Sequence, residues 1–409
     1  MKKVLGLALG ILTAIGGFLD IGDLVTNAVV GSRFGMSLGW VVVVGVVGIC
    51  LFAQMAGRVA AVSGRATFEI IRERLGPRLA LANLGASFLI NLMTITAEVG
   101  GIALALQLAS SVTYLLWVPL AAFAVWLVVW RVKFSIMENV TGLVGLTLVG
   151  FAVALFLLGP NWLELGRQAL QQLPSNDEKT STYWYYAIAL FGAAMTPYEV
   201  FFFSSGAVEE SWTAKDLAQS RANVLVGFPL GGLLSLAIAG CAAVVLLPQL
   251  VAVTTLSQVV LPVALAGGKL LLAVIIIGVV AATFGAALET TLSAGYTIAQ
   301  FFGWPWGKFR APGQAARFHL LMIICVVVGA AVLTTGVDPV EVTELSVVFS
   351  AIALPLTYLP ILLVSNDPEY MGEYVNSRAM NAAALVYLVI ILVASLAAIP
   401  LMIITGVGR

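Results

Sequence analysis

The chain has 409 residues, of which 61% are hydrophobic and 10% charged, and its formal net charge at pH 7 is zero. An ordinary soluble domain carries roughly 25% charged residues, so most of this chain is expected to face lipid or other apolar helices. This composition excludes a soluble globular protein. No run of basic residues points to a nucleic-acid partner.

Eleven apolar runs are long enough to cross about 30 Å of hydrocarbon as helices. They lie near residues 4–31, 37–60, 79–109, 113–130, 139–159, 183–210, 221–247, 264–302, 315–335, 340–364 and 381–406. We therefore expect an all-α integral membrane protein with about 11 transmembrane helices. If the N-terminus is cytoplasmic, 15 Lys and Arg residues fall on the cytoplasmic side and 5 on the other, which favours this orientation and an outside C-terminus.

The first run is interrupted by the sequence GGFLDIGD at residues 16–23, which holds two carboxylates, Asp20 and Asp23, and three glycines. A carboxylate at the centre of a membrane helix costs roughly 2.5–3.5 kcal/mol, so two of them need a compensating cation. Glycine makes unwinding inexpensive, and unwound backbone is tolerated at this depth only where protein or a polar cavity covers it. The simpler alternative is that one acid caps the helix that restarts at Leu24.

The sixth run carries a second interruption, GAAMTPYE at residues 192–199. Pro197 removes a backbone donor and disfavours helical geometry at Thr196. The first and sixth runs each open a block of five, and broken helices in corresponding positions of two halves indicate a transporter built as an inverted repeat, with its site between the breaks. The domains are then 1–159 (first repeat), 160–182 (extracytoplasmic loop), 183–364 (second repeat) and 365–409 (cytoplasmic loop and eleventh span).

These residues resemble the NRAMP (natural resistance-associated macrophage protein) divalent-metal transporters. The family's first-span signature Asp-Pro-Gly-Asn stands here as Asp20-Ile21-Gly22-Asp23, and its third-span Ala-Glu-Val as Ala97-Glu98-Val99. The loop at Gly31–Gly35, the tenth-span stretch Leu354–Leu363 and Met371-Gly372-Glu373 also match. The resemblance covers nearly the whole chain and implies two inverted five-helix repeats of the leucine-transporter type, with helices 1 and 6 broken.

The sixth span departs from the family pattern, because Met-Pro-His is replaced by Thr196-Pro197-Tyr198. Met195 stands one residue early, and about 100° of helical rotation should turn its thioether away from the site. The resemblance also implies that the carbonyl of Ala193 is a ligand. The expected metal ligands are Asp20, Asp23, Ala193 and Thr196.

Further acids lie inside the apolar runs. Glu98, Glu199 and Glu289, with Tyr198, are expected to form a secondary polar cavity, because buried carboxylates must be paired, protonated or hydrated. The alternative for Glu98 is a simple interhelical hydrogen bond, and Glu289 matches no family ligand. Two polar family positions are apolar here: an acid three residues before Glu98 is Ile95, and a tenth-span glutamine is Ala353.

A site that offers only oxygen ligands favours a hard divalent cation, with Mg²⁺ first and Mn²⁺ second. The resemblance then extends to the NRAMP-related magnesium transporters. Because the family histidine and one acid are replaced, we expect transport without proton coupling. No nucleophile with a base or cofactor motif indicates an enzyme, and no resident cofactor is expected beyond the transported ion.

Three alternatives remain at this stage. One is a proton-coupled importer of Mn²⁺ or another transition metal. Another is an amino-acid or organic-cation transporter on the same fold, and the third is a membrane protein that binds a metal without transporting it. The expected location is the cell inner membrane, and the direction of transport and the oligomeric state are left open.

Overall fold

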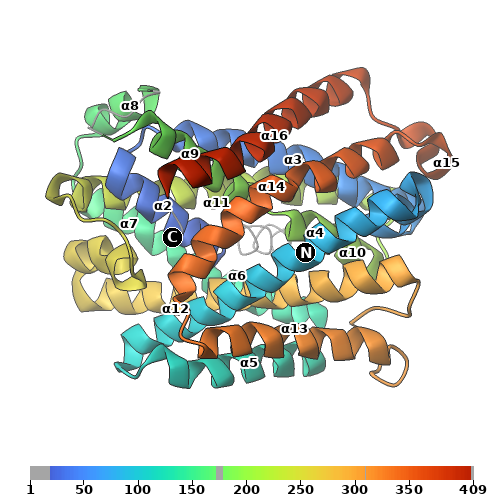
Figure 1. The fold of residues 1–409 in the computed structure, drawn as a ribbon, viewed down its shortest axis with the longest axis horizontal. Helices are drawn as coiled ribbons and strands as arrows, with labels where there is room; N and C mark the ends of the chain where they lie inside the picture. The colour runs from blue at the N-terminus through green and yellow to red at the C-terminus, as the bar shows by residue number, and fades with distance from the viewer. Residues whose placement is uncertain (1–18, 172–177, 309, 407–409) are drawn as a thin grey trace.

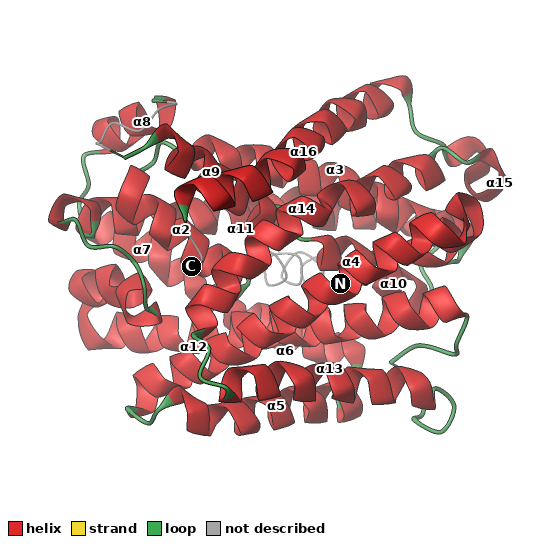
Figure 2. Ribbon diagram, in the orientation of Figure 1, coloured by secondary structure: helices red, strands yellow, loops and turns green. Residues whose placement is uncertain are grey.

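The computed structural model describes residues 19–171, 178–308 and 310–406, and every regular element in these ranges is a helix (Figures 1 and 2). Within them, ten helical segments are long and apolar enough to cross a membrane. The predicted all-α membrane fold is therefore confirmed. The first predicted span, 4–31, begins outside the described residues, so only its second half is seen as a helix.

The helices follow the predicted runs closely. In the first half of the chain they are α2 (Ile21–Phe34), α3 (Gly39–Ser63), α4 (Thr67–Ser110), α5 (Tyr114–Arg131), α6 (Phe134–Gly145), α7 (Val149–Leu157) and α8 (Trp162–Leu170). In the second half they are α9 (Thr180–Ala194), α10 (Pro197–Glu209), α11 (Leu217–Val245), α12 (Leu256–Phe302), α13 (Ala316–Thr334), α14 (Pro339–Ser365), α15 (Pro368–Met371) and α16 (Arg378–Thr405). Helix α8 lies within 160–182, which the sequence analysis treated as a loop.

Two of the longest helices contain a glycine kink. Gly76 in α4 has φ 75° and Gly268 in α12 has φ 65°, a region that glycine enters at little cost. The predicted spans 79–109 and 264–302 correspond to the parts of these helices near and beyond the kinks. Residues 67–75 therefore form a separate helical arm at one end of the α4 span.

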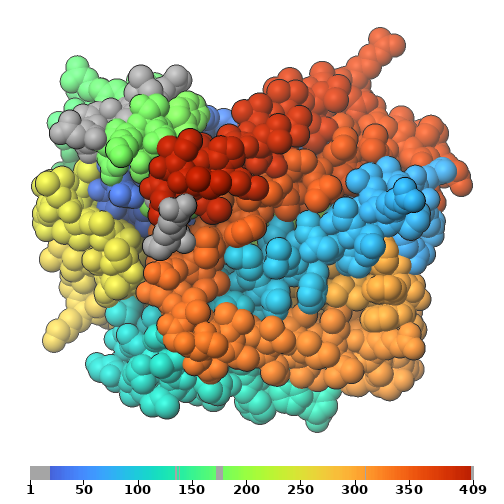
Figure 3. Space-filling view, in the orientation of Figure 1, coloured from blue at the N-terminus to red at the C-terminus, as the bar shows by residue number. Residues whose placement is uncertain are grey.

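Helix α4 is central to the packing and contacts α12, α14, α13 and α5. Figure 1 shows it crossing the middle of the molecule, with α5 and α13 along one edge and α16 along the opposite edge. The space-filling view shows α16, α14, α4 and α13 among the helices exposed on this face (Figure 3). The broken first and sixth helices lie inside this frame, where α2 packs against α11 and α9.

Glycines let the broken helices approach their neighbours closely. A Cβ added at Gly31 of α2 would lie 2.1 Å from the carbonyl oxygen of Ala239 on α11. One added at Gly192 of α9 would lie 2.2 Å from the carbonyl oxygen of Val347 on α14. Membrane helices commonly use small residues in this way, because van der Waals contact drives their association. These contacts position both breaks in the protein interior.

Candidate metal site

Asp20 directly precedes α2, which begins at Ile21. Its backbone is extended (φ −94°, ψ 179°) and its Oδ1 accepts a hydrogen bond from the Asp23 N–H at 2.7 Å. Asp20 is thus the N-cap of α2, as the simpler alternative proposed, although the helix begins at Ile21 rather than at Leu24. Its second oxygen, Oδ2, accepts a hydrogen bond from the Tyr198 hydroxyl at 3.4 Å. The predicted unwinding at Gly16 and Gly17 lies outside the described residues.

The second break separates α9 from α10. Met195 (φ −123°, ψ 51°) and Thr196 (φ −63°, ψ 124°) are not helical, and α10 begins at Pro197. A helix would pair the Ala193 carbonyl with the N–H of residue 197, but proline has none. The Ala193 carbonyl therefore has no helical partner at residue 197, but Ala193 does not line the cavity at which the two breaks meet, so its role as a ligand stays a prediction.

The two breaks meet at a small polar cavity of about 10 Å³, which has room for about one water-sized occupant. Asp20, Thr196 and Glu98 all line it. The remaining lining residues are Ile21, Gly22, Thr94, Ala97, Thr343, Ser346, Val347 and Ser350. The structure therefore brings two of the four predicted ligands together with one residue of the predicted secondary cavity.

Three hydroxyls on α14 line this cavity and were not identified from the sequence. Thr343, Ser346 and Ser350 are all buried, and the Ser346 hydroxyl lies 3.0 Å from that of Thr94. Their spacing of three and four residues places them on one face of a helix. That spacing was the available signal, although nothing in the sequence shows which face of α14 meets the breaks.

Asp23 faces a different neighbour. Its carboxylate is fully buried, accepts a hydrogen bond from Asn27 Nδ2 at 2.8 Å and another from the Ser235 hydroxyl of α11. Asp23 does not line the cavity that Asp20 and Thr196 share. In this conformation Asp20 lines the cavity, whereas Asp23 is hydrogen-bonded to Asn27 and Ser235.

Glu98 and Glu199 each contact a break directly. Glu98 accepts a hydrogen bond from the N–H of Ile21 at 3.2 Å, and Glu199 accepts one from the Thr196 hydroxyl at 3.3 Å. Glu289 on α12 is also buried. Among the ion pairs between described residues, none involves these three acids, Asp20 or Asp23. Buried carboxylates without a protein cation must carry protons or bind a cation.

Sulfur is absent from the described lining of the cavity. Met195 points toward α3, because a Cβ added at Gly48 would lie 2.6 Å from its Sδ. Its backbone carbonyl accepts a hydrogen bond from the Tyr358 hydroxyl at 3.2 Å. No three His, Cys, Asp or Glu side chains among the described residues are grouped to hold a metal ion. A cation in the cavity would therefore contact at most two carboxylates, those of Asp20 and Glu98. Its other ligands would be hydroxyl and carbonyl oxygens.

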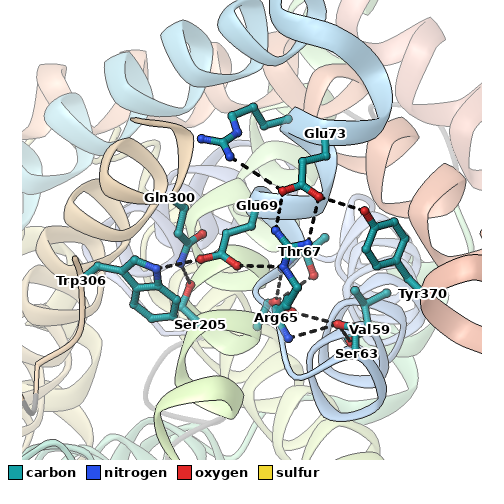
Figure 4. Close-up of polar contacts among 12 residues, drawn as sticks. Val59, Ser63, Arg65, Thr67, Glu69, Glu73, Ser205, Gln300, Trp306 and Tyr370 are labelled. Carbon is teal, nitrogen blue, oxygen red and sulfur yellow. Dashed lines mark hydrogen bonds and ion pairs between the residues drawn. The ribbon is translucent and has the colours of Figure 1, made fainter. Parts of the chain in front are cut away.

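A group of polar contacts joins α10, α12 and the arm of α4 on the predicted cytoplasmic side (Figure 4). Ser204 of α10 lies 2.7 Å from the Thr67 hydroxyl and accepts from the Thr67 N–H at 2.9 Å. Ser205 accepts from Gln300 Nε2 of α12 at 2.9 Å. These bonds attach the helix after the second break to the arm of α4 and to α12.

Arg65 organises the outer part of this network. It forms ion pairs with Glu69 and Glu73 of the α4 arm, and the Tyr370 hydroxyl donates to Glu73 at 2.9 Å. Trp306, in the segment after α12, donates to Glu69 at 2.9 Å. The carboxylate partners raise the pKa of Arg65, so it stays charged. Movement of α10 away from α4 would have to break the hydrogen bonds between Ser204 and Thr67.

Comparison with known proteins gives a consistent result. The pattern of the family described as natural resistance-associated macrophage protein-like matches residues 10–400. The "Divalent metal cation transporter MntH 1" of Pseudomonas aeruginosa is 28% identical over 399 residues, covering 94% of this chain and 88% of that protein. The MntH of Acidiphilium cryptum is 25% identical over 366 residues, covering 87% and 81%.

Solved structures share the fold. A manganese transporter of Eremococcus coleocola superposes with a TM-score of 0.72 at 20% sequence identity, covering 95% of this chain and 84% of that one. MhsT in complex with L-phenylalanine gives a TM-score of 0.64 at 16% identity, covering 95% and 98%. Likeness at this level concerns the fold alone. With the family pattern matched from residue 10 to residue 400, the chain belongs to the natural resistance-associated macrophage protein (NRAMP) family.

Proposed function

We propose that this protein carries a hard divalent metal cation across the cell inner membrane, with Mg²⁺ as the first candidate and Mn²⁺ as the second. Transport of divalent metal cations is supported by the names of its relatives in Pseudomonas aeruginosa and Acidiphilium cryptum. The finer choice of ion rests on one observation. The described cavity between the two breaks is lined by oxygen donors and apolar groups, while the nearby sulfur of Met195 is packed against Gly48.

Oxygen ligands favour hard metal ions. Carboxylate, hydroxyl and carbonyl oxygens suit Mg²⁺, Ca²⁺ and Mn²⁺, whereas a thioether would favour softer transition metals. In the proposed arrangement Asp20 supplies the negative charge, Thr196 and the Ala193 carbonyl supply neutral oxygens, and Asp23 would join after leaving Ser235. Mg²⁺ releases its water reluctantly, so the cavity of about 10 Å³ must widen for a partly hydrated ion to pass.

The second candidate is a proton-coupled importer of Mn²⁺ or another transition metal. The observation in its favour is the group of buried acids near the breaks, Glu98, Glu199 and Glu289. Uncoupled transport remains our first proposal, because Tyr198 and Ile95 occupy positions where the family resemblance implies titratable groups. An amino-acid substrate is disfavoured, since the described cavity is far smaller than the roughly 300 Å³ of a typical small-molecule pocket.

The experiment that tests this function is ion uptake by the purified protein in liposomes that contain an indicator for Mg²⁺ or Mn²⁺. Asp20→Ala should abolish uptake, because no neutral side chain offsets a divalent charge in a low-dielectric cavity. Glu341→Gln is the matched control, since Glu341 is an exposed acid on α14, and it should leave uptake unchanged. Uptake by Asp20→Ala at the wild-type rate would place the ion elsewhere.

A further inference from the structure

A second, separate cavity lies between the end of α5 and the start of α13. It has a volume of about 240 Å³ and is lined by Trp126, Val129, Trp130, Pro312, His319, Met322 and Ile323. The Trp126 and Trp130 rings stack at 5.2 Å and form its aromatic wall. Tryptophan is enriched where a membrane span meets the headgroup layer, so this cavity lies at a membrane interface rather than at the ion path.

Two arginines lie next to residues that line this cavity. The Arg131 guanidinium lies over the Trp130 ring, 4.0 Å from its centroid. The carbonyl of Arg310 is bonded to Nε2 of the buried His319 at 3.1 Å, which places residue 310 beside the cavity wall. Arg131 and Arg310 are both exposed, and neither takes part in an ion pair between described residues.

Lys308 adds a further positive charge near the end of α5. Its ammonium group donates to the carbonyls of Val128 and Val129 at the end of α5, at 3.1 and 2.8 Å. Burial lowers the pKa of Lys308 to about 8, so the group is still mostly protonated at neutral pH. The wall of the cavity is therefore bordered by two exposed arginines and by one lysine that fixes the loop to α5 and lies near the carboxylate of Glu209.

From this geometry we infer that the α5–α13 cavity binds one anionic phospholipid, with an acyl chain against Trp126, Trp130 and Ile323 and the phosphate at Arg131 and Arg310. Basic pockets between membrane helices on the cytoplasmic side hold anionic headgroups by this combination of charge and apolar surface. A zwitterionic lipid such as phosphatidylcholine offers the same phosphate but adds a choline cation, which the two arginines repel, so its net attraction to this site is weaker. A free phosphate would leave the apolar cavity uncovered.

The test measures lipid binding to the delipidated full-length protein by native mass spectrometry, with phosphatidylglycerol and phosphatidylcholine of the same chain length. Phosphatidylglycerol should bind more tightly than phosphatidylcholine. Arg131→Gln and Arg310→Gln should each weaken phosphatidylglycerol binding about fivefold and weaken phosphatidylcholine binding less, so that the preference between the two lipids falls. The matched control is Arg378→Gln, an exposed arginine at the start of α16, which should bind as the wild type does.

A second variant separates a lipid site from general surface attraction. Ile323→Trp fills the cavity without changing charge, and it should also weaken phosphatidylglycerol binding. Soluble glycerol phosphate should not displace the lipid, because it lacks the chains. Equal binding of the two lipids by the wild type, undiminished phosphatidylglycerol binding by both arginine variants, or displacement by glycerol phosphate would each overturn the inference. Equal unfolding temperatures in phosphatidylcholine confirm that the variants are folded.

Discussion

Glu98 of α4 accepts a hydrogen bond from the backbone N–H of Ile21, the first residue of α2, at 3.2 Å. Helix starts leave several N–H groups without partners, and inside a membrane no water is at hand to satisfy them. Helix α4 therefore supplies a carboxylate that holds the start of α2 in place. This contact gives Glu98 a structural task beside any role in ion or proton transfer.

We expect Glu98→Gln to retain the fold, because the amide oxygen still accepts from Ile21, and Glu98→Ala to lower stability. Leaving a buried donor without a partner costs about 1–3 kcal/mol. Thermal unfolding of the purified variants in detergent, followed by intrinsic fluorescence, measures this difference. Ile95→Ala, a buried change three residues earlier, controls for lost side-chain volume on α4. Equal unfolding temperatures for Glu98→Gln and Glu98→Ala would contradict the proposed role of this bond.

A second prediction concerns the contact between Asp23 and Ser235. If the carboxylate must leave α11 to reach the ion, Ser235→Ala should release it and raise the apparent ion affinity. Asp23→Asn should weaken transport less than Asp20→Ala does, because the amide keeps an oxygen and restores the family residue. Uptake rates at several ion concentrations distinguish these outcomes. An Asp23→Asn variant as inactive as Asp20→Ala would show that both charges are required at once.

Selectivity gives a third prediction. Thr196→Met should improve Cd²⁺ and Mn²⁺ relative to Mg²⁺, since it returns a soft ligand to a position that lines the cavity. Competition between the three ions during uptake measures the change. Thr94→Ser is a mild control in the same cavity and should keep the wild-type order. If the order is the same in a folded Thr196→Met protein, Thr196 does not touch the ion.

The breaks were predictable because their signals are local. Carboxylates and glycines around Asp20, and a proline at residue 197, stand out inside apolar runs, and each acts on the backbone within a few residues. The turn of Met195 away from the site also follows from helix geometry alone. The break at Pro197 is found at the expected residue, and the Met195 sulfur is directed toward Gly48, although Met195 itself is not helical; the unwinding at Gly16 and Gly17 lies outside the described residues.

The partners of these residues were not predictable in the same way. Ser235 on α11 and Ser346 on α14 are separated from the first break by more than two hundred residues, and only packing decides that they meet it. The place of Asp23 depends on this packing, so its separation from the shared cavity could not be read from the sequence. Two other predictions, the inverted relation of the two repeats and the orientation of the termini, stay predictions.

The last prediction is that ion transport is not coupled to protons. Coupling needs groups that change protonation as the ion binds, and a polar path that carries the proton away. Tyr198 stands where the family resemblance implies a histidine, and a tyrosine hydroxyl lacks the titration near physiological pH that lets a histidine carry a proton. The Tyr198 hydroxyl donates a hydrogen bond to Asp20. The proton stays on the tyrosine in this contact, so the contact does not require proton transfer.

The path beyond Tyr198 is also restricted. Ile95 is apolar, and Glu98 is bonded to the backbone of Ile21 rather than to a chain of titratable groups. We therefore expect an inward gradient of Mg²⁺ or Mn²⁺ to fill proteoliposomes with the ion while an internal pH dye stays constant. Glu289→Gln serves as the comparison, because Glu289 is the buried acid that could supply an unforeseen route. Internal acidification that scales with ion uptake, and disappears in Asp20→Ala, would make the protein a proton-coupled transporter.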